Sequence, residues 1–256
     1  MHLVLLWDYL EIQIRKLYYS MNSEKKQYDP KNEISEIKKR YSKRKKNYNP
    51  LTPYIYMIQQ EKERALIRWV HKESLEPVDN KKLLEVGCGS GQNLIQLIRL
   101  GFNPKFIVGN ELMQERVISA RVLLPSDVKI IEGNALDLDF EEGYFNIIFQ
   151  SMVFSSILDD NFQFQLAKKM WEWAKVGGGI LWYDFTFNNP KNNDVRGVKL
   201  NRVKELFPEG KVKTWKLTLA PPLARAVTKI HPSLYSVFNI FPFLRTHILC
   251  WIKKTN

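Results

Sequence analysis

The chain of 256 residues has room for one well-buried core with extensions, since domains cluster at about 100–150 residues. Apolar residues make up 45% of it and charged residues 26%, close to the globular average, which excludes wholesale disorder and a fibrous repeat. The two cysteines, Cys88 and Cys250, cannot form a disulfide framework, so a reducing, cytoplasmic compartment fits best.

The net charge of +12 is distributed unevenly along the chain. Residues 1–50 carry 12 Lys/Arg against 6 Asp/Glu, residues 51–190 carry 14 against 18, and residues 191–256 carry 13 against 3. The mildly acidic middle therefore needs no anionic ligand. The two basic flanks favour an anionic partner, such as nucleic acid, a phosphorylated substrate or a membrane surface.

Residues 1–50 are predicted to be a basic extension, helical or mobile. The apolar stretch up to Leu10 has no leading Lys/Arg and is too short to span a bilayer, which favours a helix packed on the domain or lying on a membrane surface. Seven of the nine residues from Lys38 to Lys46 are basic, which is typical of a solvated face or a mobile arm. A contact with nucleic acid is the alternative for this run.

Residues 51–256 are predicted to form the folded domain. A helix after Pro53 has an apolar side and a polar side, the latter with Glu61 and Lys62. Strands and helices then alternate, with strands predicted at 83–87, 106–111, 128–132, 145–150 and 179–185 and helices at 93–100, 114–123 and 161–174. This alternation predicts an α/β fold with a parallel sheet, helices on both faces, and a ligand at the carboxyl ends of the strands.

The pattern changes after Pro190. A helix is predicted at 198–206, an exposed strand at 211–219 and a final strand at 247–252. Residues 220–246 between these strands contain four prolines and eight large apolar residues from Leu234 to Leu244, and are too apolar for a flexible linker. A folded cap is predicted there, with a partner or membrane interface as the alternative.

The clearest chemical signal is a glycine loop, Gly87-Cys88-Gly89-Ser90-Gly91, at a predicted strand-to-helix turn. Glycines let the backbone approach a ligand closely, and the following helix offers unpaired N–H groups. The spacing G-x-G-x-G differs from the dinucleotide fingerprint, which wants Gly or Ala at position 92, and no Gly-Lys-Ser/Thr of a phosphate-binding loop follows.

Carboxylates surround this loop. Glu111 ends the second strand, where a carboxylate can accept hydrogen bonds from ribose hydroxyls, and Glu85 precedes the loop. A site of carboxylates and a glycine turn, with neither Lys nor Arg, matches a nucleoside that bears a cation better than one that bears a pyrophosphate. S-adenosylmethionine, with its sulfonium, is such a ligand.

Over residues 82–185 these motifs resemble the class I S-adenosylmethionine-dependent methyltransferases, in particular the small-molecule type similar to the ubiquinone-pathway enzymes. The resemblance implies a Rossmann-like, mostly parallel seven-stranded sheet with helices on both faces. An N-terminal helical extension and a helical cap insertion before the last strand would complete that fold. The residues that it implies for cofactor binding are Glu85, Gly87, Cys88, Gly89, Gly91, Asn93, Glu111, Leu112, Asn134, Ala135, Gln150 and Ser151.

The acceptor side is predicted at the ends of the fourth and fifth strands and on the cap. Asp184, Tyr183 and His247 are the candidate catalytic residues, with Asp184 or His247 as a base. Arg225 and Arg245 would suit a phosphate or carboxylate on the acceptor, and no metal is predicted.

Several strings, among them Leu181–Phe185 and Leu219–Arg225, resemble a bacterial methyltransferase group associated with polysaccharide biosynthesis. That resemblance implies O-methylation of a sugar, a glycan or another small anionic metabolite. An RNA methyltransferase that uses the Lys38–Lys46 arm, and a cofactor-binding scaffold without activity, are the alternatives. Methylation of base amino groups is disfavoured, because Gln150–Phe154 lacks the Asn-Pro-Pro-aromatic string typical of those enzymes. A cytoplasmic location is expected, with peripheral membrane contact as an option.

Overall fold

The computed structural model describes residues 30–43, 49–190 and 192–255. The chain divides into two compact units, residues 1–32 and residues 33–256, and the second contains the sheet. The first described helix is α2 (Pro30–Ser42), and from Glu33 onward it belongs to the second unit. The predicted apolar N-terminus and the end of the basic run lie outside the described residues.

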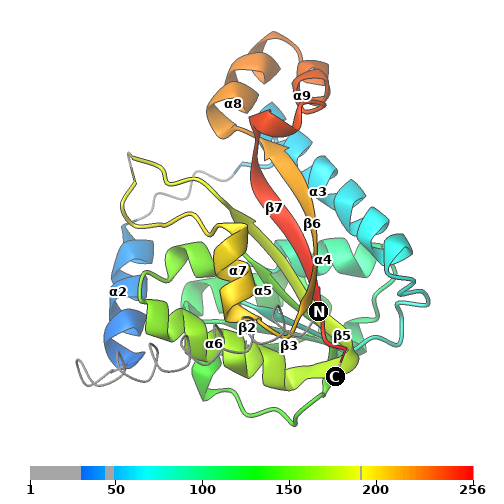
Figure 1. The fold of residues 1–256 in the computed structure, drawn as a ribbon, viewed down its shortest axis with the longest axis vertical. Coiled ribbons are helices and arrows are strands. Elements are labelled where there is room, and N and C mark those ends of the chain that lie inside the picture. Colours follow the sequence, from blue (N-terminus) through cyan, green and yellow to red (C-terminus); the bar gives the residue numbers. More distant parts are fainter. Residues whose placement is uncertain (1–29, 44–48, 191, 256) are drawn as a thin grey trace, which may run out of the picture. The chain divides into compact units, whose positions relative to one another are not determined.

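Seven strands form one sheet in the order β3-β2-β1-β4-β5-β7-β6 (Figure 1). The strands are β1 (Leu83–Val86), β2 (Ile107–Glu111), β3 (Lys129–Glu132), β4 (Phe145–Ser151), β5 (Ala174–Phe185), β6 (Lys211–Leu219) and β7 (Arg245–Lys253). The first five are parallel, whereas β7 runs antiparallel to β5, and β6 antiparallel to β7. The predicted mostly parallel, seven-stranded fold is thus confirmed.

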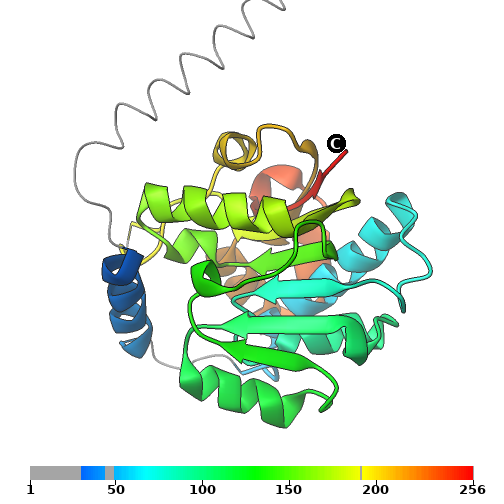
Figure 2. The same cartoon turned by 90° about the horizontal axis from the view of Figure 1, so that it is seen from below.

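Helices cover both faces of the sheet. They are α3 (Pro53–Lys72), α4 (Gln92–Arg99) and α5 (Gln114–Leu123) on one face, and α6 (Asp160–Trp173) and α7 (Leu200–Leu206) on the other. Neighbouring residues of β5 show the alternation, because Leu181 packs in the α3 cluster while the ring of Trp182 meets Phe207, beyond α7, edge to face at 6.1 Å. The strands lie side by side in Figure 2, and the arrowheads of the central ones point towards α2 (blue).

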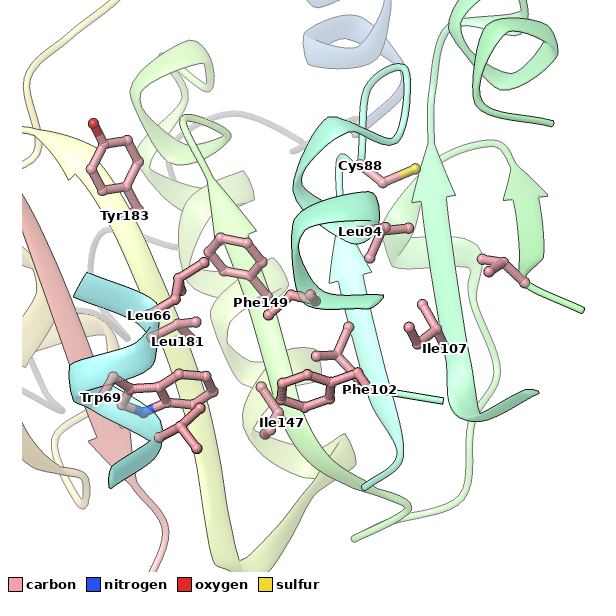
Figure 3. Packing of buried hydrophobic residues seen from close by; sticks show 14 of the residues in the cluster. Leu66, Trp69, Cys88, Leu94, Phe102, Ile107, Ile147, Phe149, Leu181 and Tyr183 are labelled. Atoms are coloured by element: carbon pink, nitrogen blue, oxygen red, sulfur yellow. The ribbon is translucent and has the colours of Figure 1, made fainter. Parts of the chain in front are cut away.

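The main core lies between α3, α4, α5 and the sheet. Leu66 and Trp69 of α3 face Leu181 and Phe149 in Figure 3, and the ring of Trp69 lies 5.2 Å from that of Trp251. All four residues of β1 are buried, as expected for a central parallel strand covered on both sides. This rigid centre holds the loops at the carboxyl ends of the strands.

The segment between β6 and β7 folds as a helical cap, as predicted, with α8 (Pro221–Ile230) and α9 (Ser233–Phe238). Glu61 of α3 anchors it: its carboxylate accepts hydrogen bonds from Thr218 N at 3.0 Å, from the Tyr235 hydroxyl at 2.5 Å and from Asn239 Nδ2 at 2.7 Å. Glu61 lies on the side of α3 that is predicted to be polar, and the cap buries its carboxylate. Among the described helices, none combines the length and apolar character that crossing a membrane requires.

Candidate active site

The glycine loop joins β1 to α4 and takes a backbone shape that favours glycine. Gly87, Gly89 and Gly91 have φ values of +66°, +57° and +85°. A Cβ atom at Gly91 would lie 2.7 Å from Cδ1 of Leu124, so this glycine permits close packing against the end of α5. A Cβ at Gly89 would meet no heavy atom within 4 Å. Gly89 therefore leaves space that a ligand can fill.

A cavity of about 370 Å³ opens at the carboxyl ends of β1, β2 and β4, within the usual range of small-molecule sites. The structure brings nine of the twelve predicted cofactor residues to its wall: Gly87, Cys88, Gly89, Asn93, Glu111, Leu112, Asn134, Ala135 and Ser151. These residues come from four separate segments of the chain. The shared cavity is the structural counterpart of the motif pattern in the sequence.

The other three predicted residues, Glu85, Gly91 and Gln150, are buried behind that wall. Glu85 and Gln150 are fully buried, and among the described residues no hydrogen-bond partner reaches Oε2 of Glu85 or Nε2 of Gln150. A buried carboxylate oxygen without a donor is costly unless a ligand completes it. Beside the glycine loop, this oxygen fits a cationic group such as the ammonium of a methionine moiety.

Two predicted residues carry hydrogen bonds that shape the cavity. Glu111 accepts from Gly89 N through Oε2 at 2.8 Å and from Met113 N through Oε1 at 2.9 Å. Asn134 accepts from Leu136 N through Oδ1 at 3.1 Å. The amide oxygen of Asn134 thus caps a short turn, and this oxygen and each Glu111 oxygen keep a second lone pair for a ligand.

Lys62 of α3 is a site residue that the sequence did not reveal. Its ammonium donates to Oδ1 of Asn93 and, at 3.5 Å, to Oγ of Ser151, while Nδ2 of Asn93 donates to Oε1 of Glu85 at 2.5 Å. Burial lowers the pKa of Lys62 to about 8, although Glu85 raises it. The expectation of a site without Lys or Arg was therefore wrong. Lys62 lies within a polar helix side, and nothing in its spacing distinguishes it from Arg64.

Burial likewise raises the pKa of Glu85 to about 7, and the hydrogen bond from Asn93 and the charge of Lys62 oppose this shift. Near neutral pH, a small change in pH therefore alters the charge beneath the glycine loop. Perturbed carboxylates of this kind gather at functional sites, which agrees with the position of Glu85 behind the cavity.

The structure keeps the predicted catalytic residues out of this cavity. Asp184 accepts from Ser155 N at 3.1 Å and from Phe185 N at 3.0 Å, and burial raises its pKa to about 7. The ring of His247 stacks on that of Tyr183 at 5.2 Å, and burial lowers the pKa of His247 to about 4. The Tyr183 hydroxyl lies 2.6 Å from Oγ1 of Thr218. Each of the three residues thus has a structural partner, which differs from the expectation of a base.

The two arginines predicted to bind the acceptor also lie away from the cavity. Arg245 donates through Nε to Asn239 O at 2.8 Å and through Nη1 to Lys216 O at 3.1 Å, so it joins the cap to β6. Arg225 is exposed, with its guanidinium 5.9 Å from the ring centre of Tyr54. The sequence placed both near the acceptor because they belong to the predicted cap, but the cap projects beyond the ends of β6 and β7 (Figure 1).

Helix α2 supplies a wall that the sequence did not predict. Ile34, Ile37 and Tyr41 line the cavity, and the guanidinium of Arg116 lies 4.4 Å from the ring centre of Tyr41. Arg40, within the predicted solvated run, donates to Glu33 at 2.7 Å and to Ser156 O at 3.1 Å. This residue therefore faces the domain and not the solvent.

Known proteins resemble this chain in its central part and in its fold. A family model described as a methyltransferase domain matches residues 83–178, and no curated protein matches the sequence. One similar structure is the geranyl diphosphate C-methyltransferase of Streptomyces coelicolor A3(2), solved with S-adenosylhomocysteine. Its sequence is 15% identical and the TM-score is 0.53, and the alignment covers 74% of this chain and 77% of that one.

Two further solved structures give similar values. A SAM-dependent methyltransferase of Archaeoglobus fulgidus has a TM-score of 0.52 at 14% identity, with 77% of this chain and 99% of that one covered. The cyclase SpnF has a TM-score of 0.55 at 14% identity, with 77% and 84% covered. At such identities the likeness concerns the fold alone.

The methyltransferase match runs from β1 into β5 and includes the glycine loop, Glu111, Asn134 and Ser151. The structure gathers these residues around one cavity at the carboxyl edge of a sheet that is mostly parallel and seven-stranded, as predicted. Residues 83–178 therefore match a methyltransferase domain, and the chain has the fold of solved S-adenosylmethionine-dependent methyltransferases.

Proposed function

We propose that this enzyme transfers a methyl group to an oxygen atom of a small anionic acceptor bound between the glycine loop and α2. The proposal rests on the position of Arg116 in the cavity wall. Among the described residues, it alone brings a Lys or Arg side chain to the cavity wall. A guanidinium suits a carboxylate or a phosphate, because its donors match two acceptor oxygens at once.

The cofactor would occupy the side of the cavity nearest the glycine loop. From behind the glycine loop, the charge of Glu85 would attract its ammonium, and Glu111 would accept from its ribose hydroxyls. Gly89 leaves the space that the backbone approach requires. When bound, S-adenosylmethionine supplies an electrophilic methyl carbon whose bond to sulfur breaks as the acceptor oxygen bonds to it. The chain's own contribution is to orient the two partners and exclude water.

The lining also bears on the kind of oxygen that reacts. Among the described residues, no His or Asp side chain lines the cavity, and the oxygens of Glu111 accept from Gly89 N and from Met113 N. A weakly acidic hydroxyl needs a general base, whereas a carboxylate or an acidic hydroxyl does not. An acidic acceptor therefore fits best. Among acidic acceptors, an acidic sugar agrees with the resemblance to methyltransferases associated with polysaccharide biosynthesis.

The outer wall is mainly apolar, with Ile34, Ile37, Ile157, Phe162 and Leu166. Such a wall would contact the carbon skeleton of the acceptor and keep water from the reacting atoms. A long RNA phosphate backbone gains little from these contacts. Arg40, in the basic run that would bind RNA, is already paired with Glu33.

The test is formation of S-adenosylhomocysteine with a panel of small carboxylates, acidic sugars, neutral sugars and RNA. The proposal predicts turnover with acidic acceptors, and an Arg116→Gln variant whose acceptor KM rises about tenfold or more with little change in cofactor affinity. Arg121→Gln, on the same helix but outside the cavity, is the matched control. Turnover confined to RNA or neutral sugars, or an unchanged KM in Arg116→Gln, contradicts the proposal.

A further inference from the structure

The end of the cap exposes large apolar side chains. Ile230, Val237, Ile240, Phe241 and Phe243, here called the cap tip, expose 80%, 50%, 68%, 46% and 75% of their surface. The rings of Phe241 and Phe243 lie 5.7 Å apart. The other exposed apolar residues form smaller groups, such as Ile118, Val122 and Leu123 of α5, whereas these five fall within 14 positions. Exposed apolar groups concentrated in this way mark an interaction surface.

A basic groove adjoins the cap tip. This cavity of about 860 Å³ lies between α3, β6 and the cap, and its wall carries five basic side chains: Arg64, Arg68, Lys72, Lys216 and Arg245. Ile240 of the cap tip and Pro242 line the same groove, so the cationic and apolar surfaces are continuous.

The charge of the groove is not neutralised within the protein. Arg64, Arg68 and Lys72 follow one another at four-residue spacing along α3, an arrangement of like charges that costs helix stability. Within the described residues, neither Arg64 nor Arg68 takes part in a hydrogen bond or an ion pair. Among the described residues that line the groove, Glu61 is the only carboxylate, so the five basic side chains leave an excess of positive charge.

The sequence around the cap adds to this positive charge. Residues 210–256 contain eight Lys/Arg and no Asp or Glu. A surface of this composition is complementary to an anionic partner over the whole C-terminal part of the chain.

The combination of the two surfaces selects the partner. Nucleic acid would use the basic groove but leave the cap tip in water. A second copy of this chain, related by a two-fold axis, would bring one basic groove against the other. A bilayer with anionic headgroups satisfies both surfaces, since apolar side chains enter the interface while Lys and Arg contact phosphates.

We propose that the cap of this enzyme docks on an anionic lipid bilayer, with the cap tip in the interface and the basic groove on the headgroups. The cap is followed by β7, which begins at Arg245. Two residues later, His247 pairs with Phe185 at the carboxyl end of β5. The docking surface thus rises from the edge of the sheet at which the cofactor cavity lies.

The test is sedimentation of the full chain with phosphatidylcholine vesicles, neutral or with about 30% phosphatidylglycerol. The proposal predicts binding to the anionic vesicles that weakens with added salt, and little binding to the neutral ones. Ile240→Ser with Phe243→Ser, and separately Arg64→Gln with Arg68→Gln, should each lower the partition coefficient about tenfold or more.

Matched controls lie near β2 and β3, at the opposite edge of the sheet from β6 and β7. Ile118→Ser with Val122→Ser removes two exposed apolar residues of α5, and Lys105→Gln with Lys129→Gln removes two exposed cations near β2 and β3. Both control variants should bind vesicles like the wild type. The proposal fails if anionic vesicles do not sediment the protein, if neutral vesicles bind it equally, or if correctly folded cap-tip and groove variants bind like the controls.

Discussion

The carboxylate of Glu111 accepts a hydrogen bond of 2.8 Å from the backbone N–H of Gly89. It joins the end of β2 to the middle of the glycine loop, which belongs to β1 and α4. The second oxygen of the same carboxylate accepts from Met113 N at 2.9 Å. Glu111 therefore shapes the cavity before any ligand binds, in addition to the ribose contact that we propose for it.

Glu111→Gln should weaken S-adenosylhomocysteine binding about tenfold or more. The amide can present one oxygen, so its NH2 group must face either Gly89 N or Met113 N, two donors in opposition. Isothermal titration calorimetry measures the effect. Glu132→Gln is the control, because Glu132 is the exposed neighbour of Glu111 in β3. Equal affinities in the two variants would remove Glu111 from the cofactor site.

Cofactor affinity should depend on the ionisation of Glu85. Burial raises its pKa to about 7, so the carboxyl is largely neutral below that pH and attracts an ammonium only above it. The affinity of the wild type for S-adenosylhomocysteine should therefore rise between about pH 6 and 7.5, by up to about tenfold per unit, while Glu85→Gln should show a flat profile. Parallel profiles in the two proteins would contradict this role.

Asp184 should influence stability in a direction opposite to that of most carboxylates. Its pKa is raised to about 7 in the folded state, so between about pH 4 and 7 the folded protein binds more protons than the unfolded chain. Its contribution to stability is then fullest below pH 4 and falls as pH rises to 7. In urea unfolding, the advantage of the wild type over Asp184→Asn should shrink by roughly 2 kcal/mol from pH 5 to 7. A growing advantage would overturn this assignment.

His247 should matter for packing and not for proton transfer. Its ring stacks on Tyr183 and burial lowers its pKa to about 4, so it is neutral near pH 7 and lies outside the cavity. We expect His247→Gln to lower the melting temperature by several degrees. Its kcat and pH profile should stay close to those of the wild type. A loss of about a hundredfold in kcat in a folded variant would restore the histidine as a base.

Most of the fold was predictable because its signals are local. Central strands such as β1 are mainly apolar and buried on both faces, and predicted Gln114–Leu123 and Lys211–Leu219 match α5 and β6 residue for residue. The glycine loop was also predictable from the sequence. Its three residues with positive φ are glycines, and other residues rarely adopt this conformation.

The rest of the site depends on contacts between distant segments. Lys62 lies 31 positions from Asn93 along the chain, and Tyr41 lies 115 from Ser156, yet each pair is in contact. Helical periodicity distinguishes polar from apolar sides, but it does not tell which polar side another element will bury, as Glu61 illustrates. For the same reason Asp184 and His247 were chosen for their residue type, while the structure surrounds them with structural partners.

Binding of S-adenosylhomocysteine to Gly89→Val and to Gly177→Val tests the central claim most directly. Both glycines have positive φ and open space at Cβ, but only Gly89 lines the cavity, so the backbone strain is matched and the position differs. Calorimetry of the folded proteins should show one site in the wild type and in Gly177→Val, and none in Gly89→Val. Unaltered affinity in Gly89→Val, or no binding to the wild type, would contradict the claim that this cavity holds the cofactor.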